Sequence, residues 1–354
     1  DSVMFKKVIV LHLVGLGVLI DHKMGTFPVK LRTMSDLLAR LTQIVGNSPL
    51  DFLPDPFPEP VPIRLYLKRD DLLHPFVSGN KWRKLKYNLL EAERQTSGGT
   101  PPDGTPSGTL LTFGGAYSNH LYATAAAGRA FGFRTIGVVR GDELAGSPDR
   151  QKPLNSTLTF CREQGMTLHF VDRATYLRAT DPDFLAQLQV RYGSCYIIPE
   201  GGTNELAIGG TAEILPEIYN QLGTWPHTVA CAVGTGGTLA GLIRAAPSRV
   251  EVLGVSALKV PTGQAAHFPG LPNFLPENVT INTDFHQGGY ARTTPELLQF
   301  IRDFEAGTGI LLEQVYTGKL LFAIYELART GYFPDQATVV AVHTGGLQGR
   351  SSRI

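Results

Sequence analysis

The chain is poor in the features that mark several large classes of protein. Its 354 residues include three cysteines, Cys161, Cys195 and Cys231, and none lies in a C-x-x-C pair, so we expect neither a disulfide framework nor a metal site. Lys and Arg number 32 against 31 for Asp and Glu, which gives no reason to expect nucleic acid or an anionic membrane as a partner. With 43% hydrophobic and 18% charged residues, the composition excludes a wholly disordered chain.

Apolar runs long enough to span a bilayer are also lacking. The run VIVLHLVGLGVLI at 8–20 covers thirteen positions, whereas a spanning helix needs about 20. It follows two lysines, as in a signal peptide, but charged residues come directly after it and no small-residue cleavage site appears. We therefore interpret residues 1–34 as an extension of uncertain role and expect a cytoplasmic protein with no stable membrane span.

Strand-like and helix-like segments alternate along most of the chain, which favours parallel sheets built from strand–helix–strand units. The residues at 47–62 are rich in proline and predict a connector, and those at 96–108 predict an exposed loop. Strands are predicted at 63–68, 109–113, 135–140, 167–171, 195–198, 228–233, 250–255 and 338–343. Helices are predicted at 35–45, 79–94, 120–131, 155–164, 183–192, 209–222, 239–245, 295–308 and 319–330. At this length, the pattern predicts two lobes with a cleft between them.

A cluster of lysines begins the helix predicted at 79–94, in the stretch SGNKWRKLK. At about 100° per residue, Lys81 lies about 40° from the apolar stripe marked by Leu85, while Lys84 and Lys86 lie about 100° to either side. Lys81 is thus expected to point inward and the other two to reach water. An amine in a low-dielectric site has a lowered pKa, as a Schiff-base lysine requires. Taken alone, however, the cluster is more typical of a solvated basic helix.

Two glycine-containing loops each follow a predicted strand and open a helix. FGGAYSNH at 113–120 places backbone N–H groups and a serine hydroxyl at a helix start, which suits a carboxylate. AVGTGGTLAG at 232–241 lets the backbone approach a phosphate. Either loop could also be an ordinary capped turn. Three further motifs flank strand ends, where α/β sheets collect ligands: EGGTN at 200–204, QVYTGK at 314–319 and HTGG at 343–346.

Together, an inward lysine, a carboxylate-type site and a phosphate-type loop form the set that a pyridoxal-phosphate enzyme needs. In order and spacing the motifs resemble the D-cysteine desulfhydrase and 1-aminocyclopropane-1-carboxylate deaminase family, which belongs to the fold-type II pyridoxal-phosphate enzymes. The matching stretches are RDDLLHPFVSGNKWRKLKY, FGGAYSNHLYATAAAGRAFG, PEGGTNELAIGG, VGTGGTLAGL, GGYARTTPE, EQVYTGK and HTGG. They extend from about Arg69 to Gly346, and the chain before about Ser35 lies outside the resemblance.

The resemblance implies an α/β fold of the tryptophan-synthase-β type, with two open, twisted, mostly parallel sheets and flanking helices. It implies a large cofactor-binding domain at 35–85 plus 199–354, a small domain at 86–198, and a homodimer. The implied cofactor is pyridoxal 5′-phosphate and the implied partner is a small amino-acid substrate.

The resemblance also implies site residues. Lys81 would carry the cofactor and take the α-proton of the substrate, with Tyr290 and Tyr316 as further catalytic residues. The implied cofactor-binding residues are Lys81, Asn80, Asn119, Gly234, Thr235, Gly236, Gly237, Thr238, Thr317 and Thr344. The implied substrate-binding residues are Ser118, Asn119, His120, Tyr290 and Tyr316.

Thr317 and Thr344 bear on the reaction that the resemblance implies. The deaminase branch typically has an acidic residue at the first position and an apolar residue at the second. A carboxylate near the ring nitrogen of the cofactor favours a protonated ring, which is the stronger electron sink, and threonine cannot supply that charge. Loss of a good leaving group such as thiolate demands less of the ring than opening a cyclopropane does. The two threonines therefore favour β-elimination.

We predict a pyridoxal-phosphate-dependent lyase that converts D-cysteine to pyruvate, ammonia and hydrogen sulfide. One alternative is a deaminase that converts 1-aminocyclopropane-1-carboxylate to 2-oxobutanoate and ammonia. Another is a non-catalytic protein that binds an amino acid or the cofactor, which retention of Lys81 and both tyrosines disfavours. An NAD-dependent dehydrogenase is disfavoured because the acidic residue after the loop at 234, Glu251, opens its strand instead of ending it. The family often has Ile-Gln where this chain has Ala116-Tyr117, a pair expected to border the substrate.

Overall fold

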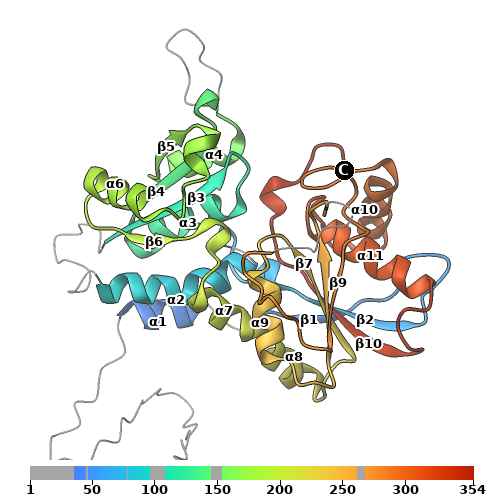
Figure 1. The fold of residues 1–354 in the computed structure, drawn as a ribbon. Helices are drawn as coiled ribbons and strands as arrows, with labels where there is room; N and C mark the ends of the chain where they lie inside the picture. The colour runs from blue at the N-terminus through green and yellow to red at the C-terminus, as the bar shows by residue number, and fades with distance from the viewer. Residues whose placement is uncertain (1–35, 45–46, 78, 96–107, 145–153, 261–267) are drawn as a thin grey trace, which may run out of the picture.

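Two open β-sheets organise the chain, and helices pack against both of them (Figure 1). The computed structural model describes residues 36–44, 47–77, 79–95, 108–144, 154–260 and 268–354. Within these residues the larger sheet has the strand order β1-β2-β10-β7-β8-β9, and the smaller sheet has the order β5-β4-β3-β6. The predicted α/β fold with two mostly parallel sheets is confirmed.

The larger sheet combines strands from both ends of the described chain. Its strands are β1 (Leu50–Phe52), β2 (Ile63–Lys68), β7 (Thr228–Val233), β8 (Glu251–Ser256), β9 (Val279–Asn282) and β10 (Ala337–Val342). β1 pairs with β2 antiparallel, and the remaining pairs are parallel. Every residue of β7 and β10 is buried, because central strands of a parallel sheet are covered on both faces. This explains the uninterrupted apolar runs TVACAV and ATVVAV.

The smaller sheet is formed by one continuous stretch of the chain. Its strands are β3 (Thr109–Gly115), β4 (Arg134–Arg140), β5 (Thr167–Val171) and β6 (Tyr196–Ile198), and all of them run parallel. Because they are parallel, the loops that follow β3, β4 and β6 emerge at the same edge. This edge carries much of the candidate site.

The helices begin and end near the predicted positions, and several have clear capping residues. They are α1 (Asp36–Ile44), α2 (Asn80–Gln95), α3 (Asn119–Phe131), α4 (Ser156–Glu163), α5 (Arg173–Tyr176), α6 (Pro182–Tyr192), α7 (Glu205–Ala212), α8 (Ile214–Leu222), α9 (Gly237–Ala245), α10 (Pro295–Thr308) and α11 (Thr317–Arg329). α2 packs against α3, which covers the smaller sheet, and against α7, which contacts α9 of the larger sheet. The start of α2 therefore lies between the two sheets.

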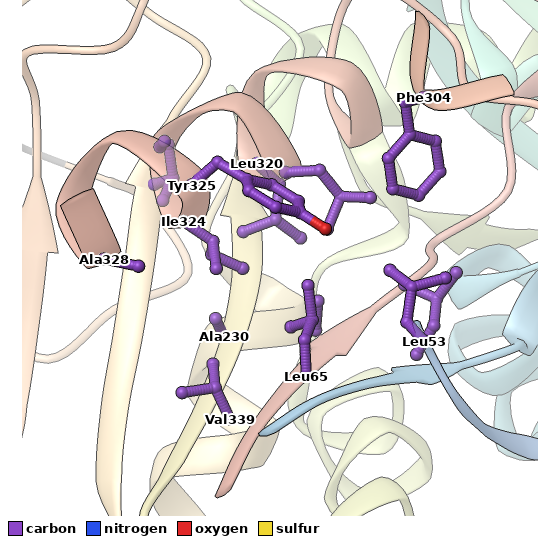
Figure 2. Close-up of a cluster of buried hydrophobic side chains, with 14 of the residues drawn as sticks. Leu53, Leu65, Ala230, Phe304, Leu320, Ile324, Tyr325, Ala328 and Val339 are labelled. Carbon is purple, nitrogen blue, oxygen red and sulfur yellow. The ribbon is translucent and has the colours of Figure 1, made fainter. Parts of the chain in front are cut away.

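The main apolar core lies between the larger sheet and the pair of helices α10 and α11 (Figure 2). Leu65 and Val339 point from the sheet toward Leu320 and Ile324 of α11, and all four are buried. Each such buried side chain stabilises the fold by roughly 1.5–3 kcal/mol relative to exposure. The core thus anchors the N-terminal end of α11, which borders the candidate site.

The structure differs from the sequence-based expectation at a few elements. The helix predicted at 209–222 is two helices, α7 and α8, which meet at Glu213. Pro216 has no N–H to bond the Ala212 carbonyl, so one continuous helix cannot form there. β1 lies inside the predicted proline-rich connector, and neither β9 nor the short α5 was predicted. No described helix is long and apolar enough to cross a membrane.

Some predictions fall where the structure gives no test. The extension at 1–34, with its apolar run, and nearly all of the loop predicted at 96–108 lie outside the described residues. The two sheets use strands from 50–68 plus 228–342 and from 109–198. The domain boundaries themselves stay a prediction.

Candidate active site

A cavity of about 530 Å³ opens where the carboxyl ends of strands from both sheets meet. This is the edge at which open α/β sheets bind ligands. The predicted site residues that line it are Asn80, Lys81, Ser118, Asn119, His120, Gly234, Thr235, Gly236, Gly237, Thr238, Tyr290, Tyr316 and Thr344. The fold thus brings together residues from six separate motifs of the sequence.

Lys81 lies in the first turn of α2, which is locked against the loop after β10. Gly79, just before the helix, has φ +65°, and a Cβ there would lie 1.9 Å from the Thr344 carbonyl oxygen. The backbone N–H of Asn80 donates to the same oxygen at 3.3 Å. Burial lowers the pKa of Lys81 to about 8, and the charge of Glu313 partly opposes this shift. The neutral amine that can accept a proton is therefore accessible near neutral pH.

Lys84 corrects the expectation that only Lys81 of its cluster points inward. Its side chain is buried, and its Nζ donates to the Gly201 carbonyl at 3.0 Å and to Thr203 Oγ1 at 3.1 Å. The helical projection failed because α2 is covered on two sides, by α3 and by α7, so its buried surface is wider than one apolar stripe. Burial and the nearby charge of Lys81 hold the pKa of Lys84 well below its usual value.

The glycine loop between β7 and α9 forms a cradle beside Lys84. Gly236 is the N-cap of α9, with φ +91°, a conformation that favours glycine. A Cβ on Gly237 would lie 2.7 Å from Thr203 Oγ1 and 2.9 Å from Lys84 Nζ. Asn80 Nδ2 donates to Thr238 Oγ1 at 2.9 Å and so ties this loop to the helix of Lys81. Backbone donors, a helix N-terminus and the Lys84 amine, which a bound anion would hold protonated, converge here, as an anion requires.

Ser118 and Asn119 open α3 on the other side of the cavity. Ser118 is the N-cap of the helix and its Oγ accepts from the Leu121 N–H at 3.2 Å, so the predicted ordinary cap is present. This bond uses an Oγ lone pair and leaves the hydroxyl proton available to a carboxylate. The Oδ1 atom of Asn119 accepts from Gln348 Nε2 at 2.8 Å, which directs its Nδ2 donor elsewhere. Asn119 and Lys81 also share a small recess with Thr344.

His120 lines the same cavity, and its hydrogen bonds define which ring nitrogen carries the proton. Thr112 Oγ1 donates its one proton to the Ile198 carbonyl at 2.8 Å, so His120 Nε2 must donate to Thr112 Oγ1, also at 2.8 Å. The Nδ1 atom is buried and has no partner in the described part of the chain. Burial and the charges of Lys81 and Lys84 hold the pKa of His120 well below its usual value. His120 is therefore neutral and offers one unused acceptor.

The predicted tyrosines line the cavity and contact each other. The rings of Tyr290 and Tyr316 are 6.3 Å apart, edge to face, and Tyr316 packs on Gly234, whose Cβ would lie 3.1 Å from the ring. Burial raises the pKa of both phenols, so both are protonated donors at neutral pH. The Tyr316 N–H donates to the buried carboxylate of Glu313 at 2.7 Å.

Thr317 is the one predicted site residue that does not line the cavity. It is buried, its Oγ1 accepts from the Glu313 N–H at 3.0 Å, and its N–H donates to Glu313 Oε1 at 2.6 Å. Thr317 therefore closes the turn that begins α11. Its predicted contact with the cofactor has no support from the lining of the cavity.

The family described as pyridoxal-phosphate dependent enzyme matches residues 41–345. The chain belongs to this family. The predicted cofactor, pyridoxal 5′-phosphate, and the fold-type II class are thereby confirmed.

Individual relatives place this pyridoxal-phosphate enzyme in the expected branch. A Thermotoga maritima protein named "Putative 1-aminocyclopropane-1-carboxylate deaminase" is 31% identical over 303 residues, which cover 80% of this chain and 89% of the relative. An Arabidopsis thaliana protein named "Bifunctional D-cysteine desulfhydrase/1-aminocyclopropane-1-carboxylate deaminase, mitochondrial" is 29% identical, covering 82% and 74%. A crystal structure of an "ACC deaminase homologue" has a TM-score of 0.68 at 26% identity, covering 88% of this chain and 95% of that one. The resemblance stated from the motifs is confirmed.

The residues around the cavity fit the cofactor of this enzyme family. The Gly234–Thr238 loop lines the cavity without side chains at 234, 236 and 237, so its backbone can approach a phosphate, and the Lys84 amine beside it would be held protonated by that anion. Lys81 supplies the amine, and Asn119 Nδ2 can donate to a ring oxygen. The orphaned Nδ1 of His120 also calls for a donor from a bound molecule. The individual roles of these residues stay predictions.

Sequence reasoning missed four residues that belong to the site. Lys84 lines the phosphate cradle, and Arg140 and Glu200 line the cavity from the ends of β4 and β6. Glu313 is buried behind Tyr316. The positions of Arg140 and Glu200 at strand ends were readable from the sequence, but nothing in it distinguished them from other charged residues.

We expect Lys84→Met to weaken the binding of pyridoxal phosphate by about 10- to 100-fold, since a charge-assisted hydrogen bond contributes roughly 1.5–3 kcal/mol. Binding of pyridoxal, which lacks the phosphate, should be unchanged. Fluorescence titration of cofactor-free protein with both ligands measures the difference. Lys86→Met is the matched control, because Lys86 is paired with Glu213 at 2.9 Å and does not line the cavity. An equal loss for both ligands would contradict the assignment of Lys84 to the phosphate.

Proposed function

We propose that this enzyme is a lyase that removes the α-proton and the β-thiolate of D-cysteine, giving pyruvate, ammonia and hydrogen sulfide. Pyridoxal phosphate, when bound to the amino group of the substrate, withdraws electrons from the α-carbon and so acidifies its proton. Loss of that proton and of thiolate leaves a carbon–carbon double bond. The released enamine tautomerises to an imine, and water hydrolyses its carbon–nitrogen double bond to give pyruvate and ammonia.

Different side chains of this site act in different steps of that reaction. The neutral amine of Lys81 accepts the α-proton, which its lowered pKa of about 8 permits. The hydroxyl of Ser118 and the N–H groups at the start of α3 bind the substrate carboxylate. Tyr290 and Tyr316 line the cavity, and in this proposal one of their protonated phenols donates a proton to the leaving sulfur. The cavity thus supplies a base on one side and acids on another.

The observation that carries the proposal is a threonine at position 317, where the resemblance gives the deaminase branch an acidic residue, together with a second uncharged residue at Thr344. Thr344 shares the recess of Lys81 and Asn119, and no described acidic residue lines that recess. Glu200 is the acidic residue among those that line the main cavity, and it comes from the smaller sheet. The nearby buried carboxylate of Glu313 accepts from the backbone N–H groups of Val315, Tyr316 and Thr317. Without a carboxylate at position 317 or 344, a protonated ring nitrogen is less stabilised, which favours elimination of a good leaving group over ring opening.

Deamination of 1-aminocyclopropane-1-carboxylate is the second candidate. The name of the Thermotoga maritima relative favours it, whereas the name of the Arabidopsis thaliana relative gives both activities. Both reactions need the same base and the same carboxylate site, so these features do not separate them. Tyr117, which is 69% exposed at the mouth of the cavity, is placed to select between substrates.

We expect purified enzyme to release pyruvate and sulfide from D-cysteine at least about ten times faster than it releases 2-oxobutanoate from 1-aminocyclopropane-1-carboxylate, a difference of roughly 1.4 kcal/mol in the barriers. The measurement is keto-acid release under matched conditions, with L-cysteine and other D-amino acids as controls. Faster turnover of the cyclopropane substrate would instead establish the deaminase. Turnover of neither, with the cofactor bound, would favour a different amino acid or a non-catalytic binding protein.

A further inference from the structure

Lys319 is buried, and its ammonium group contacts backbone carbonyl oxygens instead of a carboxylate. It lies in the first turn of α11 and is fully buried. Its Nζ donates to the carbonyl oxygens of His286 and Gly289 at 2.7 Å each, and that of Ala257 lies at 3.4 Å. No carboxylate within the described residues forms an ion pair with it. A buried cation at the start of a helix is unfavourable, so these carbonyl groups must compensate for it.

The three carbonyl groups, here called the carbonyl cage (the oxygens of Ala257, His286 and Gly289), belong to segments that border the active site. Ala257 precedes Leu258, which lines the cavity, and Gly289 precedes Tyr290. The segment at 287–291 is held in an uncommon conformation. Gln287 and Ala291 have φ of 53° and 55°, and the glycines between them have φ of 93° and 110°. Such a conformation persists only when the surroundings hold it in place.

Converging carbonyl oxygens are the ligands by which proteins bind K⁺ and other monovalent cations. Their negative ends repel one another unless a positive charge lies between them. Lys319 supplies that charge from within the chain. Burial lowers its pKa to about 8, with Glu313 opposing the shift, so the ammonium form predominates at neutral pH.

We propose that the Lys319 ammonium group is a built-in substitute for a bound monovalent cation, and that it positions Tyr290 by holding the carbonyl cage together. Lys319 is thus a positioning residue and does not touch the substrate. The proposal holds for any substrate of the site. It implies that the enzyme as it exists needs no added K⁺, whereas a variant that opens the cage does.

The test compares two substitutions of Lys319, one that leaves the carbonyl cage empty and one that fills it without a charge. Lys319→Ala removes the side chain and leaves space, so the melting temperature of the cofactor-free protein should fall by about 4 °C or more. The melting temperature of Lys319→Ala should then rise again when KCl or methylammonium chloride is added, but not when choline chloride is added at the same ionic strength. Lys319→Met fills the same space without charge, so it should be destabilised and show no specific response to K⁺. Lys259→Met, an exposed lysine next to Gly289, is the matched control and should behave as the unmodified protein does.

A second readout connects the cage to Tyr290. In cofactor-loaded Lys319→Ala, K⁺ should restore turnover with the same half-saturating concentration that restores the melting temperature. A merely structural lysine would give no such cation-specific recovery. Unchanged melting temperatures in both variants, or an equal response to K⁺ and choline, would overturn the proposal. If Lys319→Ala does not fold, the melting temperature of Lys319→Met decides. A value equal to that of the unmodified protein overturns the proposal. A lowered value that does not respond to K⁺ supports the proposal.

Discussion

Replacing Lys81 with alanine should abolish both turnover and the visible absorption band of the cofactor-loaded enzyme. Lys81 is the amine that lies between the start of α3 and the phosphate cradle, and it shares its recess with Asn119 and Thr344. Removing a positioned general base typically lowers a rate 10²- to 10⁴-fold, and loss of the covalent link to the cofactor should put this variant at the upper end, about 10⁴-fold. Absorbance of the purified protein and keto-acid release measure the two effects.

Lys86 provides the control for this prediction, whereas Lys84 does not. Lys84 lies next to the phosphate cradle, so its substitution also disturbs the cofactor. Lys86→Ala removes a lysine of the same helix that does not line the cavity, and it should retain the band and at least about half of the activity, since surface ion pairs contribute little. A band that survives in Lys81→Ala but disappears in Lys86→Ala would refute the assignment.

Replacing Gly236 with aspartate should weaken cofactor binding by about 100-fold or more. The residue has φ +91°, and its Cβ would lie 2.9 Å from Leu271 Cγ, so any side chain there strains the loop. The left-handed conformation costs roughly 1–2 kcal/mol, and a carboxylate beside a bound phosphate at the helix start adds a comparable electrostatic cost. Equilibrium binding of pyridoxal phosphate to the cofactor-free protein measures the loss.

Two further variants separate strain from charge in this loop. Gly236→Asn has nearly the same shape without the charge, and asparagine tolerates positive φ, so it should lose less affinity than aspartate. Gly209→Asp introduces the same charge on α7, where a Cβ would meet nothing within 4 Å, and should bind the cofactor normally. Equal affinities for Gly236→Asp and Gly209→Asp would show that the phosphate binds elsewhere.

Much of the site could be predicted because its motifs are local. The stretches around Ser118 and Gly236 each combine a strand end, a turn and a helix start within about ten residues, and the stretch around Lys81 is a helix start; such signals are readable without the rest of the fold. Their order and spacing along the chain carried the resemblance. The structure confirms that these motifs line one cavity, although it does not assign a role to each residue.

Other features depended on contacts between segments far apart in the sequence. Lys84 was expected to reach water because one helix viewed alone has one apolar stripe, whereas α2 is covered by two neighbouring helices. The contact of Thr317 with the cofactor, which the resemblance implies, stays a prediction, but the bond of its hydroxyl to the Glu313 N–H was not foreseen. Neither the second covering helix nor the bonding partner is visible in a local pattern.

The sequence by itself determined the family, the cofactor and the α/β class, because these depend on short motifs and on the alternation of strands and helices. The tertiary structure decided which polar groups are buried and paired. It placed Lys84 beside the glycine loop at 234–238, left one nitrogen of His120 without a partner among the described residues, and put the ammonium group of Lys319 among three carbonyl oxygens. Charge and hydrogen bonding act through space at distances of a few ångströms, so they become defined only when the two sheets and their loops come together.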